Sequence, residues 1–151
     1  MGIDTVIRPS WDTYFLNIAL AVSKRSSCLR RNYGAVIVDT YNRIVSTGYN
    51  GSPAGAPNCI DNQFCPREEQ NIPKGQGYEL CPAVHAEMNA ILNADPVRLK
   101  DATIYIAGYE FASDELADGH PCHLCQKLIR GSTIRNVVYW DKEGVVQRYR
   151  V

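Results

Sequence analysis

Apolar positions in the first third of the chain recur with two different periods, and each period predicts an element. The stretch WDTYFLNIALAVSKR, residues 11–25, predicts a helix because its apolar residues share one face at helical spacing, and Ser10 is a suitable N-cap. That face consists of Tyr14, Phe15, Ile18, Ala19 and Val22. The apolar runs AVIVD at 35–39 and RIVSTGY at 43–49 flank the turn TYN, which predicts a β-hairpin.

The remainder of the chain alternates between irregular stretches and short regular elements. No period is visible between residues 50 and 80, after which AVHAEMNAILNA at 83–94 predicts a helix. TIYIA at 103–107 and NVVYW at 136–140 predict strands, and PCHLCQKLIRG at 121–131 predicts a short helix that begins with Pro and ends with Gly. This order predicts one domain over residues 1–151, with a mixed sheet covered by helices in three layers.

Composition and charge narrow the classes of partner. The 151 residues carry 16 basic and 16 acidic side chains, so the net charge is zero, which disfavours long nucleic acids but leaves a mononucleotide open. The N-terminus MGIDTVIRPSWDTYF has no pattern of a secretory signal, and no apolar run is long enough to span a membrane. We therefore expect a cytoplasmic protein, in which six cysteines favour metal binding or catalysis over disulfides.

Two short motifs carry candidate chemistry. Cys122 and Cys125 are three positions apart at a predicted helix start, where the helix dipole favours the thiolate form that binds metals. His85 lies at the start of another helix, two residues before Glu87. A Cys-x-x-Cys pair alone is compatible with redox chemistry as well as with metal binding. Together with His85 it provides three zinc ligands and leaves a fourth position for water, with Glu87 near enough to move protons.

The combination of His-x-Glu with Pro-Cys-x-x-Cys is the known signature of zinc-dependent nucleobase deaminases. HAEMNAI and PCHLC resemble the cytidine/deoxycytidylate deaminase superfamily. RSSCLRRNYGAVIVD, STGYNGSPAGAPNC and the run from CPREE to ELCPAVHAE resemble its deoxycytidylate (dCMP) deaminase branch, so that the resemblance covers roughly residues 11–140. It implies a three-layer α/β/α cytidine-deaminase-like fold with a central mixed sheet.

The resemblance also implies roles for individual residues. His85, Cys122 and Cys125 correspond to the ligands of the catalytic zinc, and Glu87 corresponds to the proton shuttle. Asn50 matches the asparagine that holds the sugar, and the backbone N–H of Ala86 matches the group that binds the base. A nucleotide substrate, a homo-oligomer and a deoxynucleoside triphosphate effector are further implications. The segment AGYEFASDELADGH at 107–120 departs from the family pattern beside the active site.

Other candidate residues have open alternatives. Cys28, Cys59, Cys65 and Cys81 are candidates for a second, structural zinc site, which the resemblance also implies, or are ordinary small buried residues.

Arg30, Arg31 and His120 each have two alternative roles as well. Arg30 and Arg31 either hold a phosphate or form a solvated basic turn. His120 either lines the pocket or caps a helix, and we expect the cap.

The sequence therefore predicts a zinc-dependent hydrolase that converts dCMP and water to dUMP and ammonia. One alternative is a deaminase of another substrate, such as a cytidine nucleoside, an adenine or guanine compound, or tRNA adenosine. A zinc-stapled binding module without turnover is a second alternative, but it leaves the presence of Glu87 unexplained. A thiol-redox protein is a third, and it leaves both His85 and Glu87 unexplained.

Overall fold

The computed structural model describes residues 7–151. Residues 1–6 lie outside the described residues. They include the start of the stretch expected to carry no secretory signal and the start of the predicted single domain. The described chain forms a sheet of six strands in the order β2-β1-β3-β5-β6, with β4 paired to β3. The strands are β1 (Arg31–Val38), β2 (Ile44–Tyr49), β3 (Thr103–Glu110), β4 (Leu116–Ala117), β5 (Asn136–Trp140) and β6 (Val146–Arg150).

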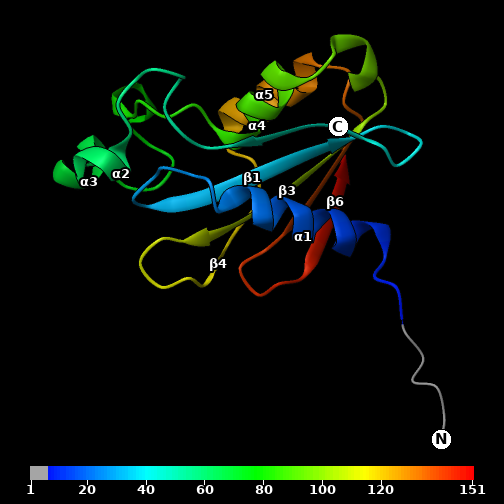
Figure 1. Ribbon diagram of the computed structural model, residues 1–151, viewed down its shortest axis with the longest axis horizontal. Coiled ribbons are helices and arrows are strands. Elements are labelled where there is room, and N and C mark those ends of the chain that lie inside the picture. The colour runs from blue at the N-terminus through cyan, green and yellow to red at the C-terminus, as the bar shows by residue number, and fades with distance from the viewer. Residues whose placement is uncertain (1–6) are drawn as a thin grey trace, which may run out of the picture.

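The sheet is mixed, as predicted, because β3 and β5 run parallel while the other neighbouring strands run antiparallel. Helix α1 (Trp11–Ser23) covers one face, and α4 (Ala86–Asn93) and α5 (His123–Gly131) cover the other (Figure 1). The predicted three-layer α/β/α fold is therefore confirmed. No helix within residues 7–151 is long and apolar enough to cross a membrane.

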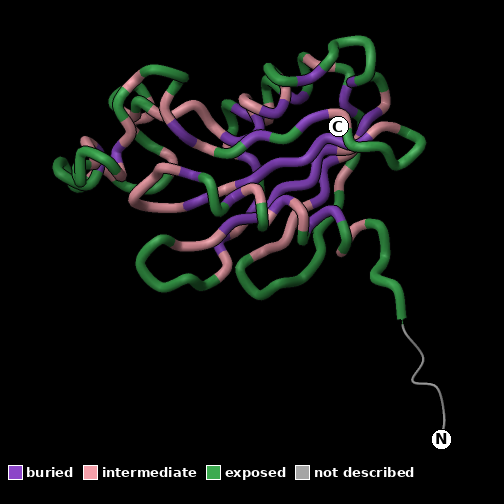
Figure 2. The backbone as a smooth tube through the Cα atoms, viewed as in Figure 1, coloured by how far each residue is buried: buried purple, intermediate pink, exposed green. Residues whose placement is uncertain are grey.

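Alternating side chains of the central strands fill the two spaces between the layers. On β1, Ala35 and Ile37 belong to the core cluster beneath α4, whereas Val36 and Val38 belong to the cluster beneath α1. Figure 2 shows this burial as a continuous band along the middle strands, with the exposed segments around it. The strands are thus buried on both faces, which fits their nearly unbroken apolar sequence.

Helix α1 begins as the sequence predicts, with the Ser10 side chain accepting a hydrogen bond from the Thr13 N–H. Its buried face is rotated from the predicted one. Leu16 is buried and Tyr14 is 44% exposed, so including Tyr14 in the core face was wrong. Helical spacing admits both arrangements, and the sheet against which α1 packs selects one of them.

Helix α4 starts at Ala86, three residues later than predicted, because Val84 still forms an extended bridge with Gly51. Gly48 on β2 allows this helix to lie directly on the sheet. A methyl group at Gly48 would overlap the backbone of Ala86 and Ala90. The close approach of β2 therefore fixes where the N-terminus of α4 lies.

Several short elements have no counterpart in the predicted fold. β6 is mostly exposed and two of its five residues are arginines, so its sequence has no apolar run, and β4 has only two residues. The irregular 50–80 region contains two single-turn helices, α2 (Cys59–Asn62) and α3 (Pro66–Glu69), and the 3₁₀ helix η1 (Tyr78–Leu80). A further 3₁₀ helix, η2 (Pro96–Leu99), follows α4. We call residues 59–81 the strap; its α2 and α3 lie at the end of the molecule away from the C-terminus (Figure 1).

Candidate metal centre and active-site pocket

Two helix N-termini meet on the same face of the sheet. His85 is the N-cap residue of α4, and Cys122 is the N-cap residue of α5. The His85 Nδ1 atom lies 3.5 Å from the Cys122 sulfur and 3.3 Å from the Cys125 sulfur. Within residues 7–151, this is the only group of three or more His, Cys, Asp or Glu side chains whose ligand atoms all lie within 4.8 Å of one another.

These three side chains fit a zinc ion in both chemistry and spacing. Zinc in a tetrahedral site binds nitrogen at about 2.0–2.1 Å and sulfur at about 2.3 Å, which sets the two kinds of ligand about 3.6 Å apart. The nitrogen–sulfur separations of 3.3 and 3.5 Å are close to that value. One nitrogen and two sulfur donors also leave a fourth tetrahedral position open, as catalytic zinc sites do.

The electrostatics of the cluster favour a cation. The hydrogen bond with Cys125 lowers the pKa of Cys122 to about 3 against the effect of burial, and His85 adds to the lowering. The same hydrogen bond, together with burial, holds the pKa of Cys125 above its ordinary value. Burial alone would lower the pKa of His85, but Cys122 and Glu87 raise it. The lowered pKa of Cys122 favours its thiolate form, which is the form that binds a divalent metal.

Glu87 lies in the first turn of α4 and is only 6% exposed. Burial raises the pKa of its carboxyl group. A carboxyl whose pKa moves towards neutrality can both accept and donate a proton at the pH of the cell, which is the requirement for general acid/base catalysis. Glu87 and the ligand cluster border the same pocket, although the Glu87 carboxylate is not part of the three-ligand group.

The pocket also contains the two other residues expected to bind substrate. Ala86 is the first residue of α4, and within the described residues its N–H donates to no backbone or side-chain acceptor. Asn50 accepts hydrogen bonds through Oδ1 from Ser26 and Tyr33, and donates one from Nδ2 to the Arg31 carbonyl. One N–H of the Asn50 amide therefore remains for another acceptor.

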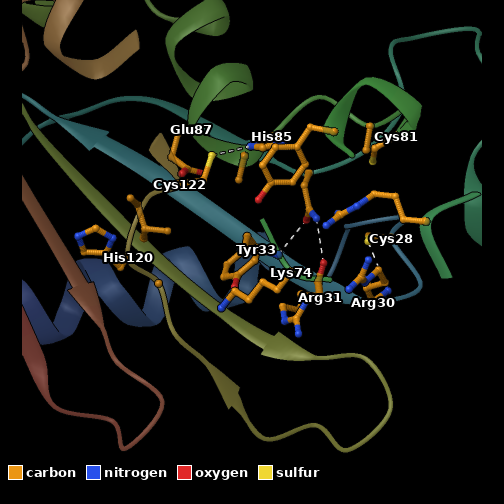
Figure 3. A pocket seen from close by; sticks show the side chains of 17 residues that line it. Cys28, Arg30, Arg31, Tyr33, Lys74, Cys81, His85, Glu87, His120 and Cys122 are labelled. Carbon is orange, nitrogen blue, oxygen red and sulfur yellow. Dashed lines mark hydrogen bonds between the residues drawn. The ribbon is translucent and has the colours of Figure 1, made fainter. Parts of the chain in front are cut away.

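Figure 3 shows His85, Glu87 and Cys122 together, with Arg30, Arg31 and Lys74 gathered further along the pocket. Both arginines line it, but each already has a carboxylate partner. Arg30 lies 2.8 Å from Glu68, and Arg31 lies 3.0 Å from Glu110. The alternative of a solvated basic turn does not describe these residues, because both are largely covered and ion-paired.

Three of the four remaining cysteines, Cys59, Cys65 and Cys81, belong to the strap, and Cys28 lies between α1 and β1. Cys28 and Cys81 border the pocket, and Cys59 and Cys65 belong to α2 and the N-cap of α3. Burial raises the pKa of Cys28, with smaller contributions from Cys81 and Cys65, so the thiols lie near one another. All four are free thiols, and in the described part of the chain no three of their sulfurs lie within 4.8 Å of one another.

Sequence reasoning missed Arg67, Lys74 and Tyr78, through which the strap brings cationic and aromatic side chains to the pocket. The Tyr78 ring lies edge-on to the His85 imidazole, with ring centroids 4.7 Å apart. His120 was expected to cap a helix, which is wrong. It borders the pocket and lies edge-on to Tyr139. No sequence period signals these positions, because irregular segments bring them to the site.

Fold and site together define a zinc-binding enzyme of the α/β class. The family model for the cytidine and deoxycytidylate deaminase zinc-binding region matches residues 9–141. A deoxycytidylate deaminase of Mycobacterium phage D29 is 42% identical over an alignment of 137 residues that covers 87% of this chain and 95% of the phage protein. The chain belongs to the cytidine and deoxycytidylate deaminase family, which confirms the resemblance deduced from the sequence.

Other relatives are longer, and the solved structures agree in fold. The deoxycytidylate deaminase of Schizosaccharomyces pombe is 39% identical over 87% of this chain, which spans only 37% of the yeast protein. The dCMP deaminase of cyanophage S-TIM5 superposes with a TM-score of 0.60 at 22% identity, covering 89% of this chain and 86% of that one. A cytidine deaminase from Burkholderia pseudomallei gives 0.58 at 16% identity, covering 91% of each chain.

Proposed function

We propose that this chain is a hydrolytic deaminase that converts dCMP and water to dUMP and ammonia. The observation that carries the proposal is a buried carboxyl group, Glu87, beside a His-Cys-Cys cluster in a pocket that also contains cationic side chains. The names of the relatives from phage and yeast, and the cyanophage dCMP deaminase whose title reports a complex with dCMP and dUMP, support this substrate.

His85, Cys122 and Cys125 would hold a zinc ion, which supplies Lewis acidity that lowers the pKa of a water molecule in its open coordination position. Glu87 would accept one proton from the attacking water and deliver it to N3 of the base, and would then carry the second proton of that water from the new C4 hydroxyl to the departing amino group. Burial of Glu87 supports this role, because its raised pKa suits a group that must donate as well as accept.

Ala86 and Asn50 would orient the substrate during these steps. The first N–H of a helix points along a dipole that favours partial negative charge, so the Ala86 N–H is suited to an oxygen or nitrogen of the base. Asn50 would donate its remaining amide N–H to a sugar hydroxyl. The expectation that Arg30 or Arg31 holds the phosphate remains a prediction, and both lie along the pocket with carboxylate partners.

A second zinc ion, bound by Cys28, Cys59, Cys65 and Cys81, is part of the proposal. Four thiolates are a common ligand set of structural zinc, and the strap has little apolar core to hold it otherwise. The mutual effect of Cys28, Cys65 and Cys81 on pKa values supports their proximity. A single domain over residues 1–151, a homo-oligomer, a deoxynucleoside triphosphate effector and a cytoplasmic location stay predictions from the sequence.

Ammonia release is the direct test. Purified protein is incubated with cytosine, adenine and guanine compounds as nucleosides and as mono-, di- and triphosphates. The proposal requires dCMP to give the highest kcat/KM. Preference for an adenine or guanine compound would move the assignment to another deaminase. Absence of ammonia from all of them, with zinc bound, would favour the binding module.

A further inference from the structure

Cationic side chains outnumber carboxylates in the pocket. Its lining includes Arg30, Arg31, Arg67 and Lys74, against the single carboxyl group of Glu87 among the described residues. A phosphate monoester carries a charge of about −1.5 to −2 at neutral pH. The pocket therefore has the charge that such a group needs, and the question is which cations are free to meet it.

Arg30 and Arg31 are engaged in holding other parts of the chain. Arg30 lies 2.8 Å from Glu68 of the strap and donates to the Ile72 carbonyl at 3.1 Å. Arg31 lies 3.0 Å from Glu110 at the end of β3. Each charge is thus largely balanced by a carboxylate, and each pair fixes a segment of the pocket wall.

Arg67 is different, because it is buried without a carboxylate partner. It is 8% exposed, and its guanidinium lies 4.7 Å from the centre of the Tyr78 ring. Its Nε and Nη2 atoms donate to the carbonyls of Gln76 and Pro73. In the described part of the chain, Nη1 donates to no acceptor and no acidic group pairs with Arg67.

A buried guanidinium of this kind is unfavourable by itself. Arginine does not lose its proton in proteins, so burial cannot be relieved by neutralisation. An uncompensated buried charge is strongly destabilising, whereas an anion in the pocket would supply the missing partner.

The position of Arg67 suits a nucleotide whose base lies at the metal centre. Tyr78 contacts both groups, since its ring centre lies 4.7 Å from the His85 ring centre and 4.7 Å from the Arg67 guanidinium carbon. Arg67 and His85 thus both contact one aromatic side chain and line the same pocket, so a single nucleotide can reach from the metal centre to the guanidinium. Lys74, also from the strap, is exposed and has no ion pair within residues 7–151.

We propose that Arg67 and Lys74 of the strap are the specificity-determining residues that recognise the 5′-monophosphate of the substrate, with Arg30 and Arg31 bracing the pocket wall. This inference rests on the proposed deaminase function and adds the means by which a nucleotide is preferred to its nucleoside. Two unpaired cations match the charge of one phosphate monoester, and the planar guanidinium offers two N–H groups to its oxygens.

The test compares dCMP with deoxycytidine in ammonia release. Lys74→Gln and Arg67→Gln are each expected to lower the ratio of kcat/KM for dCMP to that for deoxycytidine by on the order of ten- to a hundredfold, mainly through KM for dCMP. Lys100→Gln is the matched control, because Lys100 is also exposed and lies outside the pocket. It should keep the ratio of the unmodified enzyme.

A second measurement covers the case in which Arg67→Gln disturbs the strap. Inorganic phosphate should inhibit dCMP turnover competitively, and Lys74→Gln should weaken that inhibition by about tenfold or more. An unchanged ratio and unchanged phosphate inhibition in Lys74→Gln would overturn the proposal. So would an Arg31→Gln variant that alone abolishes the preference for dCMP.

The outcomes separate this inference from the proposed function. Equal kcat/KM for dCMP and deoxycytidine in the unmodified enzyme would exclude phosphate recognition and would indicate a nucleoside deaminase. If the zinc-loaded enzyme releases ammonia from neither compound, the proposed function itself is contradicted.

Discussion

Replacing Glu87 by Gln tests the assignment of the proton shuttle with the smallest change in shape. The side chain is 6% exposed, and an amide occupies nearly the same volume, so packing around α4 should be preserved. Glu87 lies outside the His-Cys-Cys group, so zinc binding should persist. The amide cannot accept a proton from water and deliver one to the base, so only the chemical step should suffer.

The size of the loss follows from the surroundings of Glu87. It is the only carboxyl group among the described residues that line the pocket, so no neighbouring acid can take over its task. General acid/base catalysis contributes about 10² to 10⁴-fold to a rate. Losing it raises the activation barrier by about 2.7 to 5.4 kcal/mol. We therefore expect kcat for dCMP to fall by at least about a hundredfold, with a small change in KM.

The assay combines ammonia release, zinc content by elemental analysis, and thermal unfolding. Glu69→Gln is the control, since it is the same substitution at an exposed position of α3 outside the pocket. Turnover within a few-fold of the unmodified enzyme would refute the role of Glu87. Loss of zinc together with activity would show that Glu87 binds the metal, which contradicts the mechanism in another way.

Three further predictions concern the metal content, the sugar contact and the packing of α4. Elemental analysis should give two zinc ions per chain and about one in Cys59→Ser, while a value of one in the unmodified protein would exclude the structural zinc. Asn50→Ala should lower kcat/KM for both dCMP and deoxycytidine and also lower Tm, because the amide bonds Ser26 and Tyr33; an effect on dCMP alone would contradict this. Gly48→Ala should destabilise the protein by about 1–3 kcal/mol in denaturant unfolding, since the added methyl meets the α4 backbone, and an unchanged midpoint would argue against that contact.

Elements with a strong apolar period were predictable from the sequence, and elements defined by their neighbours were not. The helix at 11–25 and the strands at 35–39 and 103–107 have apolar runs that must be buried whatever the order of the strands in the sheet. β6 has almost no such run, and it exists because β5 offers it a hydrogen-bonding edge from Asn136 to Trp140. Its pairing is a tertiary effect that no local pattern contains.

The same division applies to the site. The four residues of the two motifs stand at helix starts. The spacing of Cys122 and Cys125 indicates that their sulfurs share one face, and the structure brings both together with His85. Arg67 and Tyr78 come from a stretch without any period. Their place beside His85 depends on contacts such as the hydrogen bonds from Arg67 to the Gln76 and Pro73 carbonyls. Side chains delivered by irregular segments could be found only in three dimensions.

The strap has a consequence for how the enzyme loses activity. Among residues 59–81 only Cys59 and Arg67 are buried, so this segment shares little of the apolar core that stabilises the sheet. Segments with few buried apolar contacts open with a smaller free energy than the whole domain does. Inactivation on heating or metal loss should therefore follow the local opening of the strap and precede the melting of the sheet. The lifetime of the active enzyme and the stability of its fold are then two separate quantities. Mutations in the strap should change the first, and mutations in the core of the sheet should change the second.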